Sequence, residues 1–343
     1  MLATVEINAW HWAGFVAIIL VFLALDLGVF HRTAHVVKFS EACGWTFTWV
    51  TLSLLFALAL VPARGKVEAL EFLTGYVIEL SLSMDNVFVI ALIFAYFRVP
   101  LQYQHRVLFW GILGALLMRG GMIWLGTELI RHFEWALNVF GIFLVLTGIK
   151  MLFSKDEGVH PEKNIVLRLA RRAFPVSRDF DGQKFFTRVR GLSARRGEAP
   201  DPSHAAHSKV PLSRWLAGLA LTPLALVLLM VETTDLIFAV DSIPAIFAVT
   251  QKPFIVFTSN VFAILGLRSL YFVLANAIGY FRYLKTGLSV VLIFIGGKML
   301  AAHWDVEVPI GASLGIVAGI IALAIAASVF AARRDRGEPP PQS

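Results

Sequence analysis

Two short acidic motifs interrupt an otherwise apolar chain. The segment ELSLSMDNVF contains Glu79 and Asp85, and the segment DLIFAVDSIP contains Asp235 and Asp241. In each motif the acids are six positions apart, and a small polar residue follows the second acid. A carboxylate in the middle of a membrane helix costs at least about 2.5 kcal/mol unless it is paired, protonated or bound to a cation. The duplicated motif therefore predicts a cation site or a set of buried ion pairs.

The residues around these motifs offer oxygen ligands. No His or Cys lies within the acidic segments, which disfavours zinc and copper and suits magnesium, calcium or manganese. Six acids lie in apolar windows, and only Arg119 and Arg268 lie comparably deep, so a divalent cation is the simplest neutraliser. The candidate metal ligands are Asp26, Glu79, Asp85, Asn86, Glu232, Asp235, Asp241, Ser242 and Asn260.

Helix geometry leaves two arrangements open for the paired acids. Positions six apart differ by about 240° around a straight helix and by about 9 Å along it, so one helix cannot aim both acids at one point. Either the helix unwinds between the two acids, or each acid serves a different station along a path. Unwinding is easier in the second motif, because Pro244 closely follows Asp241.

A purely structural reading of the acids is the main competitor. Arg119, Arg268, Lys150 or Lys298 can serve as their counter-ions, with no ligand involved. This reading explains neither the duplication of the motif nor the excess of negative charge. We therefore expect Arg119 and Arg268 to act as counter-ions or in gating, beside a cation site formed by the acids.

The composition shows which elements must position these side chains. The chain has 343 residues, 58% of them hydrophobic and only 15% charged, and its mean hydropathy is +0.74. These values exclude a water-soluble domain, and the long uninterrupted apolar runs favour helices over an outer-membrane barrel. We expect an all-α polytopic membrane protein with about nine transmembrane helices. The predicted spans are 11–30, 44–62, 69–97, 106–126, 134–153, 214–249, 256–276, 284–302 and 309–331.

The chain also contains an internal repeat. After the first acidic motif follow WGILGALLMR and GIFLVLTGIKML, and after the second follow FAILGLR and VVLIFIGGKML. Each copy covers three helices, and an odd number makes consecutive copies enter the membrane from opposite faces. This predicts two inverted three-helix repeats with a shared site near the membrane midplane. The predicted units are two N-terminal helices over 1–67, the first repeat over 68–153, a basic cytoplasmic loop over 154–210, the second repeat over 211–303, a C-terminal helix over 304–332 and a disordered tail over 333–343.

Charge predicts the orientation of the chain. The net charge is +7, but the basic residues lie mostly in loops between spans, so membrane topology explains them better than nucleic-acid binding. Placing the long basic loop in the cytoplasm puts the N-terminus outside and the C-terminus inside. Four cations fall on the disfavoured side: Arg64, Lys66, Arg131 and Lys252. The sixth span is too long for one crossing, so we expect a helix broken or kinked at Pro244. The N-out topology and the lack of a eukaryotic targeting signal favour a bacterial inner (plasma) membrane.

The long loop has two structured parts. NIVLRLARRAFPV has helical spacing with an apolar and a basic face, which favours a helix on the cytoplasmic leaflet. SRDFDGQKFFTRVRG is typical of a compact turn or hairpin.

Four segments resemble the TerC family of integral membrane proteins: ELSLSMDNVFVIAL, VETTDLIFAVDSIPA, FTSNVFAILGLRSLYF and FPVSRDFDGQKFF. The family is named for tellurium resistance and is placed with the LysE-type exporters. The resemblance runs from about Asp26 to Met299, and members of the Alx type are regarded as manganese exporters. It therefore implies Mn²⁺ as the transported ion, held at the acids named above. The residues by themselves support only a hard divalent cation.

Other functions are weighed against divalent metal efflux. No enzyme is expected, because the chain lacks the HExxH and GxGD motifs of intramembrane hydrolases. The alternatives are a tellurite or oxyanion handler that uses Arg119 and Arg268 as ligands, and a scaffold acting through the cytoplasmic loop. The expected partners are a divalent metal ion and membrane lipid. A homo-oligomer or a membrane partner is left open, and no resident cofactor is expected.

Overall fold

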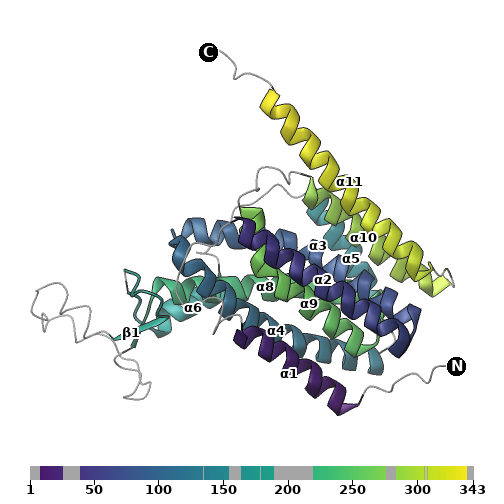
Figure 1. Cartoon of the computed structure of the whole chain (residues 1–343), viewed down its shortest axis with the longest axis horizontal. Coiled ribbons are helices and arrows are strands. Elements are labelled where there is room, and N and C mark those ends of the chain that lie inside the picture. The colour runs from purple at the N-terminus through teal and green to yellow at the C-terminus, as the bar shows by residue number, and fades with distance from the viewer. Residues whose placement is uncertain are drawn as a thin grey trace, which may run out of the picture.

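The chain folds as a bundle of long helices (Figure 1). The computed structural model describes residues 8–25, 39–133, 135–153, 164–177, 179–188, 219–275, 283–304, 306 and 308–337. Its helices are α1 (Ala9–Leu25), α2 (Phe39–Arg64), α3 (Lys66–Tyr96), α4 (Leu101–His132), α5 (Trp135–Phe153), α6 (Ile165–Ala173), α8 (Pro223–Phe247), α9 (Pro253–Ala275), α10 (Leu284–Ala301) and α11 (Ile310–Gly337). Two short strands, β1 (Phe186–Arg188) and β2 (Leu219–Leu221), pair antiparallel.

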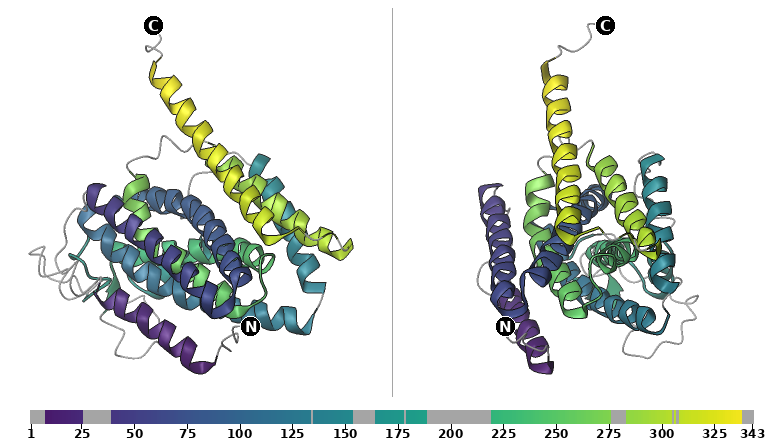
Figure 2. Two further views of the ribbon diagram at one scale, coloured as in Figure 1. Left: turned by 45° about the vertical axis from the view of Figure 1, so that its right-hand side comes forward. Right: turned by 90° about the vertical axis from the view of Figure 1, so that its right-hand side faces the viewer.

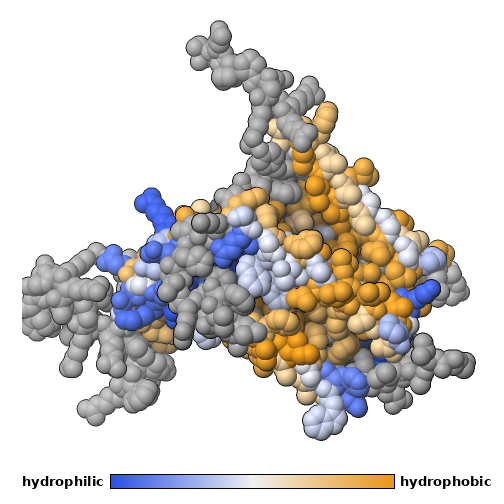
Figure 3. Space-filling model, viewed as in Figure 1, coloured by the Kyte–Doolittle hydropathy of each residue, from blue (hydrophilic) through white to orange (hydrophobic). Residues whose placement is uncertain are grey.

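The all-α polytopic prediction is confirmed. Among the described residues, eight helices are long and apolar enough to cross a membrane, namely α2 to α5 and α8 to α11. They match eight of the nine predicted spans. Helix α1 is apolar over the shorter stretch Ala9–Phe22, and the rest of the first predicted span lies outside the described residues. On the face shown in Figure 3, hydrophobic residues cover most of the bundle and hydrophilic ones gather toward its periphery.

The predicted break in the sixth span is wrong. Helix α8 is continuous from Pro223 to Phe247, and its 25 residues are enough for one crossing. It begins later than the predicted span because Thr222 caps it: the Thr222 hydroxyl accepts a hydrogen bond from the backbone N–H of Ala225 at 3.3 Å. Pro244 lies in the last turn, where its missing N–H removes one hydrogen bond and the helix ends three residues later.

Helix packing follows the internal repeat. Helices α3, α4 and α5 form the first copy, and α8, α9 and α10 form the second. Helix α3 packs against α9 as its counterpart α8 packs against α4, and the equivalent helices α5 and α10 pack against each other. These neighbours lie side by side in the two views of Figure 2. A pseudo-two-fold axis that relates the two copies would produce these same helix pairs.

Equivalent glycines bring α5 and α10 into close contact. A Cβ added at Gly148 would lie 2.8 Å from the carbonyl oxygen of Ser289, and one added at Gly296 would lie 2.7 Å from the carbonyl oxygen of Gly141. Gly148 occupies the place in the first copy that Gly296 occupies in the second, as the aligned segments GIKML and GGKML show. Small residues at such contacts let two membrane helices approach closely.

We predict that Gly296→Ala destabilises the protein, whereas Gly297→Ala does not. The added methyl at 296 would meet the backbone of α5, and such overpacking costs about 1–3 kcal/mol. A Cβ at Gly297 meets nothing within 4 Å, and alanine is the better helix former there. Thermal unfolding of the two purified variants in detergent measures the difference. Equal unfolding midpoints would contradict the close α5–α10 contact.

A small subdomain covers one end of the bundle, where α6, β1 and β2 meet the start of α8 (Figure 1). The predicted loop helix is confirmed as α6: the Asn164 side chain caps it and Leu167 is its buried residue. The predicted compact turn is confirmed at residues 181–184, with Gly182 at φ +57°. The strand after that turn pairs with β2, from the other end of the long loop, and among the described residues of the predicted segment, 177 and 179–188, no hairpin forms.

Candidate functional site

Helices α3 and α8 carry the two acidic motifs and lie against each other in the bundle. Both helices are continuous through their motifs, so the chain does not unwind between the paired acids. The first acid of each motif therefore faces a different place from the second acid, about 9 Å further along the helix. Of the two arrangements that the sequence leaves open, the structure forms the one with two stations.

The first station is a buried ion triad. Arg119 of α4 lies between Glu79 of α3 and Asp235 of α8. Its Nη2 and Nε donate to the two carboxylate oxygens of Asp235 at 2.9 and 3.2 Å, and its Nη1 pairs with Glu79. Glu79 and Arg119 are almost completely buried, with exposed fractions of 0% and 1%. Arg119 is thus the counter-ion that the sequence predicts, and it serves both copies of the repeat.

The second station is a small cavity between the two motifs. It has a volume of about 40 Å³ and is lined by the second acid of each motif, Asp85 and Asp241, and by the residue after each of them, Asn86 and Ser242. The equivalent residues of the two copies thus meet at one place. The remaining lining residues are Leu82, Arg119, Met151, Phe238, Leu288 and Leu292.

Asn86 leaves an oxygen without a partner at this cavity. Its Nδ2 lies 3.5 Å from Oδ1 of Asp235, which directs the amide nitrogen toward the first station. Its Oδ1 is buried and has no hydrogen-bond partner, although Asn86 as a whole is only 3% exposed. A buried amide oxygen without a partner is costly, and a cation in the cavity would satisfy it.

Polar groups of α4 and α5 interact with the residues of the second station. Thr147 of α5 hydrogen-bonds to Asp241, and the charge of Lys150 acts on the same carboxylate. The Ser242 hydroxyl accepts a hydrogen bond from Nη1 of Arg119 at 3.4 Å, which links the two stations. Lys150 therefore moderates the negative charge of the cavity, as the counter-ion reading of the sequence allows.

The other predicted ligands do not line this cavity. Glu232 faces α4, where its carboxylate fills the space left by the missing side chain of Gly114. Asn260 and Arg268 are buried on α9. Asp26 lies outside the described residues. Across the part of the chain that the structure describes, no three His, Cys, Asp or Glu side chains form a group that could hold a metal. The large predicted ligand set is therefore split, and the second station depends on two carboxylates with an amide and a hydroxyl.

Sequence reasoning did not identify Met151 as a residue of the site. It lines the second station from α5, next to Lys150. The available signal was the aligned pair GIKML and GGKML, because it places a Met directly after a Lys in each copy of the repeat.

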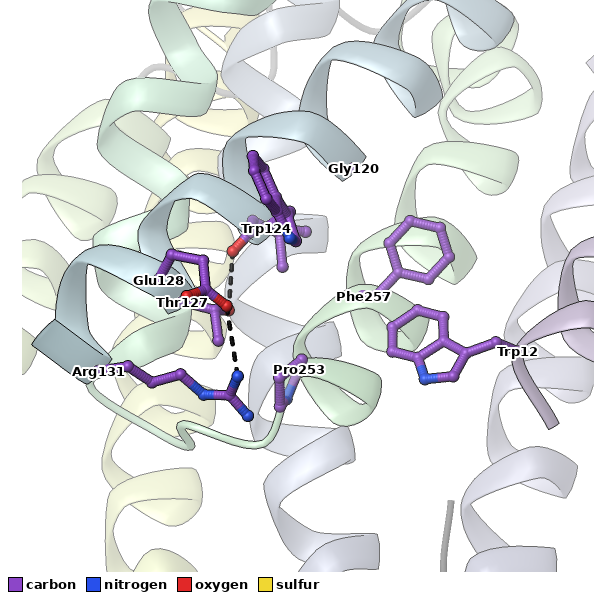
Figure 4. Close-up of a pocket in the computed structure, with 9 residues that line it drawn as sticks. Trp12, Gly120, Trp124, Thr127, Glu128, Arg131, Pro253 and Phe257 are labelled. Carbon is purple, nitrogen blue, oxygen red and sulfur yellow. Dashed lines mark hydrogen bonds and ion pairs between the residues drawn. The ribbon is translucent and has the colours of Figure 1, made fainter. Parts of the chain in front are cut away.

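A larger cavity offers different chemistry (Figure 4). It has a volume of about 390 Å³ between α1, α4 and α9, and its walls are mainly apolar, with Trp12, Trp124 and Phe257. Its two charged lining residues, Glu128 and Arg131, pair with each other at 3.3 Å. With its charges already matched, this cavity is a poorer cation site than the smaller one.

Two cations on the disfavoured side of the predicted topology are neutralised by acids. Arg64 pairs with Glu68 at 2.6 Å. Lys252 lies 3.1 Å from Glu71 and 3.3 Å from Glu68. The Thr250 hydroxyl also donates to Glu71, at 2.9 Å. This cluster ties the start of α3 to the connection between α8 and α9.

Comparison with known proteins identifies the family of the chain. The family model "Integral membrane protein TerC family" matches residues 64–336. A membrane protein of Myxococcus xanthus, STKORF319, is 49% identical over 94% of this chain and 92% of its own length. Relatives in Escherichia coli (strain K12) and Salmonella typhi, provisionally named membrane-bound redox modulator Alx, are 45% and 44% identical, over 91% and 92% of this chain and 92% of their own lengths. No solved structure matches the chain. The chain therefore belongs to the TerC family of integral membrane proteins.

Proposed function

We propose that this protein transports divalent metal cations across a membrane, with Mn²⁺ as its cargo. The proposed site is the second station, where Asp85 and Asp241 would neutralise the ion and Asn86 and Ser242 would add oxygen ligands. The observation that carries the proposal concerns Asn86, which lines a cavity with two carboxylates and whose buried Oδ1 has no hydrogen-bond partner. An ion at this point would satisfy that oxygen and would lie beside two carboxylates, one of which, Asp241, is also influenced by the charge of Lys150.

The ligand set suits transport better than permanent binding. Two carboxylates balance the charge of one divalent ion, and oxygen donors suit manganese, magnesium and calcium. Conduction needs a site that is favourable enough to enter and weak enough to leave. The cavity of about 40 Å³ has few charged ligands, so the ion would keep part of its hydration shell and could leave the site again.

The inverted repeat supplies a route for the ion. We propose that one three-helix copy rocks against the other, so that the station between α3 and α8 opens to each side in turn. Proton exchange on the carboxylates would drive the cycle. The direction would be efflux from a bacterial cytoplasm through the inner membrane, with the N-terminus outside. We infer no enzymatic step. The oxyanion alternative has less support, because Arg119 already lies between two carboxylates.

The decisive experiment measures Mn²⁺ movement in proteoliposomes. We expect purified protein to produce a saturable Mn²⁺ flux that is well above that of protein-free liposomes. Isothermal titration of the same preparation should show Mn²⁺ binding in detergent. A flux equal to that of empty liposomes, together with no Mn²⁺ binding, would overturn the proposal.

A further inference from the structure

We propose that the thioether of Met151 makes the second station select Mn²⁺ against Mg²⁺ and Ca²⁺. This inference rests on the proposed transport function and adds a determinant of specificity to it. Met151 comes from α5, whereas the oxygen donors come from α3 and α8, so three helices of the two copies surround the ion.

The lining of the cavity makes Met151 chemically distinct. Asp85, Asn86, Asp241 and Ser242 all present oxygen, and the other apolar lining residues, Leu82, Phe238, Leu288 and Leu292, have no atom that can donate electrons to a metal. Among the lining residues, the sulfur of Met151 is therefore the only soft donor. An ion that enters this cavity can exchange part of its hydration shell for this sulfur.

A thioether sulfur is a better ligand for Mn²⁺ than for Mg²⁺ or Ca²⁺. Mg²⁺ and Ca²⁺ are hard cations that take oxygen ligands, and Mg²⁺ gives up its water reluctantly. Thioether ligands favour transition metals, and Mn²⁺ is the first-row ion that also accepts a mainly oxygen site. Met151 lines a cavity of about 40 Å³, at a position where a polar side chain would offer a further oxygen instead of a thioether. Replacing it with hydrocarbon or oxygen should therefore weaken the discrimination against Mg²⁺ and Ca²⁺.

The repeat provides a matched control. Met299 of α10 is the counterpart of Met151, one residue after Lys298 as Met151 follows Lys150. Met299 is only 8% exposed and belongs to an apolar cluster with Ile78 and Leu144. Met151 is partly buried and packs against the same cluster, so the two residues share their packing and differ in that Met151 also lines the cavity. It does not line the cavity. If both methionines served packing alone, the same substitution at the two positions would have the same effect on ion preference.

The test compares Met151→Leu with Met299→Leu, because Leu conserves the volume of Met and removes the sulfur. A third variant, Met151→Gln, keeps the length of the side chain and replaces sulfur with an amide. Radiolabelled Mn²⁺ binding to each purified protein is measured against increasing Mg²⁺ and, separately, Ca²⁺. We expect Mg²⁺ and Ca²⁺ to compete about tenfold more effectively in both Met151 variants than in the wild-type protein. In Met299→Leu we expect the same competition as in the wild-type protein.

The outcomes separate this inference from the proposed function. Normal Mn²⁺ binding with unchanged competition in both Met151 variants overturns the role of the sulfur and leaves the transport proposal intact. An equal change of competition in Met299→Leu also overturns it, because the effect would then come from packing. Wild-type protein that binds no Mn²⁺ overturns the transport proposal itself. Thermal unfolding of each variant confirms that the compared proteins are folded.

Discussion

Asp85→Asn is expected to abolish Mn²⁺ transport, and Asp241→Asn is expected to do the same. Each substitution keeps the shape of the side chain and removes one of the two charges at the second station. Loss of a ligand charge should weaken Mn²⁺ binding by about 100-fold, at the upper end of what supporting residues contribute in metal sites. The empty variants should still fold, because Asn keeps the shape of Asp, and the removal of a costly intramembrane charge offsets the lost attraction between Asp241 and Lys150. Proteoliposome flux and thermal unfolding measure the two effects.

Glu128→Gln is the matched control for these variants. Glu128 is also an acid on a long helix of the bundle, but it lines the larger cavity, where it pairs with Arg131. We expect this variant to transport Mn²⁺ as wild type does. If Asp85→Asn and Asp241→Asn retained wild-type flux, the second station would not be the transport site. An equal loss in all three variants would point to a general effect of intramembrane charge.

Arg119→Leu is expected to cause the largest loss of stability. The substitution leaves the carboxylates of Glu79 and Asp235 buried without their shared counter-ion. Removing one partner of a buried pair typically costs about 3–5 kcal/mol, because the remaining charge stays in a low-dielectric environment. We expect a much lower thermal unfolding midpoint and a low yield of folded protein from membranes.

Two companion variants make this result specific. Arg131→Leu removes an exposed arginine from a surface pair with Glu128, which should cost at most about 1 kcal/mol. The triple variant Arg119→Leu/Glu79→Gln/Asp235→Asn removes the stranded charges, so it should recover most of the lost stability. The ion triad would be contradicted if Arg119→Leu were no more destabilising than Arg131→Leu, or if the triple variant were no more stable than the single one.

The structure gives the four acids of the two motifs two different roles, which the sequence does not distinguish. Glu79 and Asp235 hold the two copies together through Arg119, whereas Asp85 and Asp241 line a cavity. The sequence reading treats all of them as equivalent ligands, because their types and surroundings are alike. The difference arises because Arg119 reaches the first acid of each motif, and the continuous helices direct the second acid elsewhere.

Much of the architecture is predictable from local patterns in the chain. Long apolar runs define the spans, because a bilayer demands about 20 apolar residues whatever the neighbours are. The repeated order of motifs predicts that α3 and α8 meet, and the contacts of the two copies agree with it. The boundaries of α8 were harder to predict from the sequence. Thr222, which caps the helix, and Pro244, in its last turn, set them within a longer apolar stretch.

The sequence alone determined that this protein spans a membrane, that it is built from a repeat, and that acids of the two copies meet, because each of these follows from composition and order. Only the tertiary structure decided which acids are neutralised by Arg119, which ones line a cavity, and that Met151 joins them. The physical reason is that helix rotation and the distance between helices depend on packing among all the neighbours. A shift of one residue in register turns a side chain by about 100°, from a cavity toward lipid or a counter-ion.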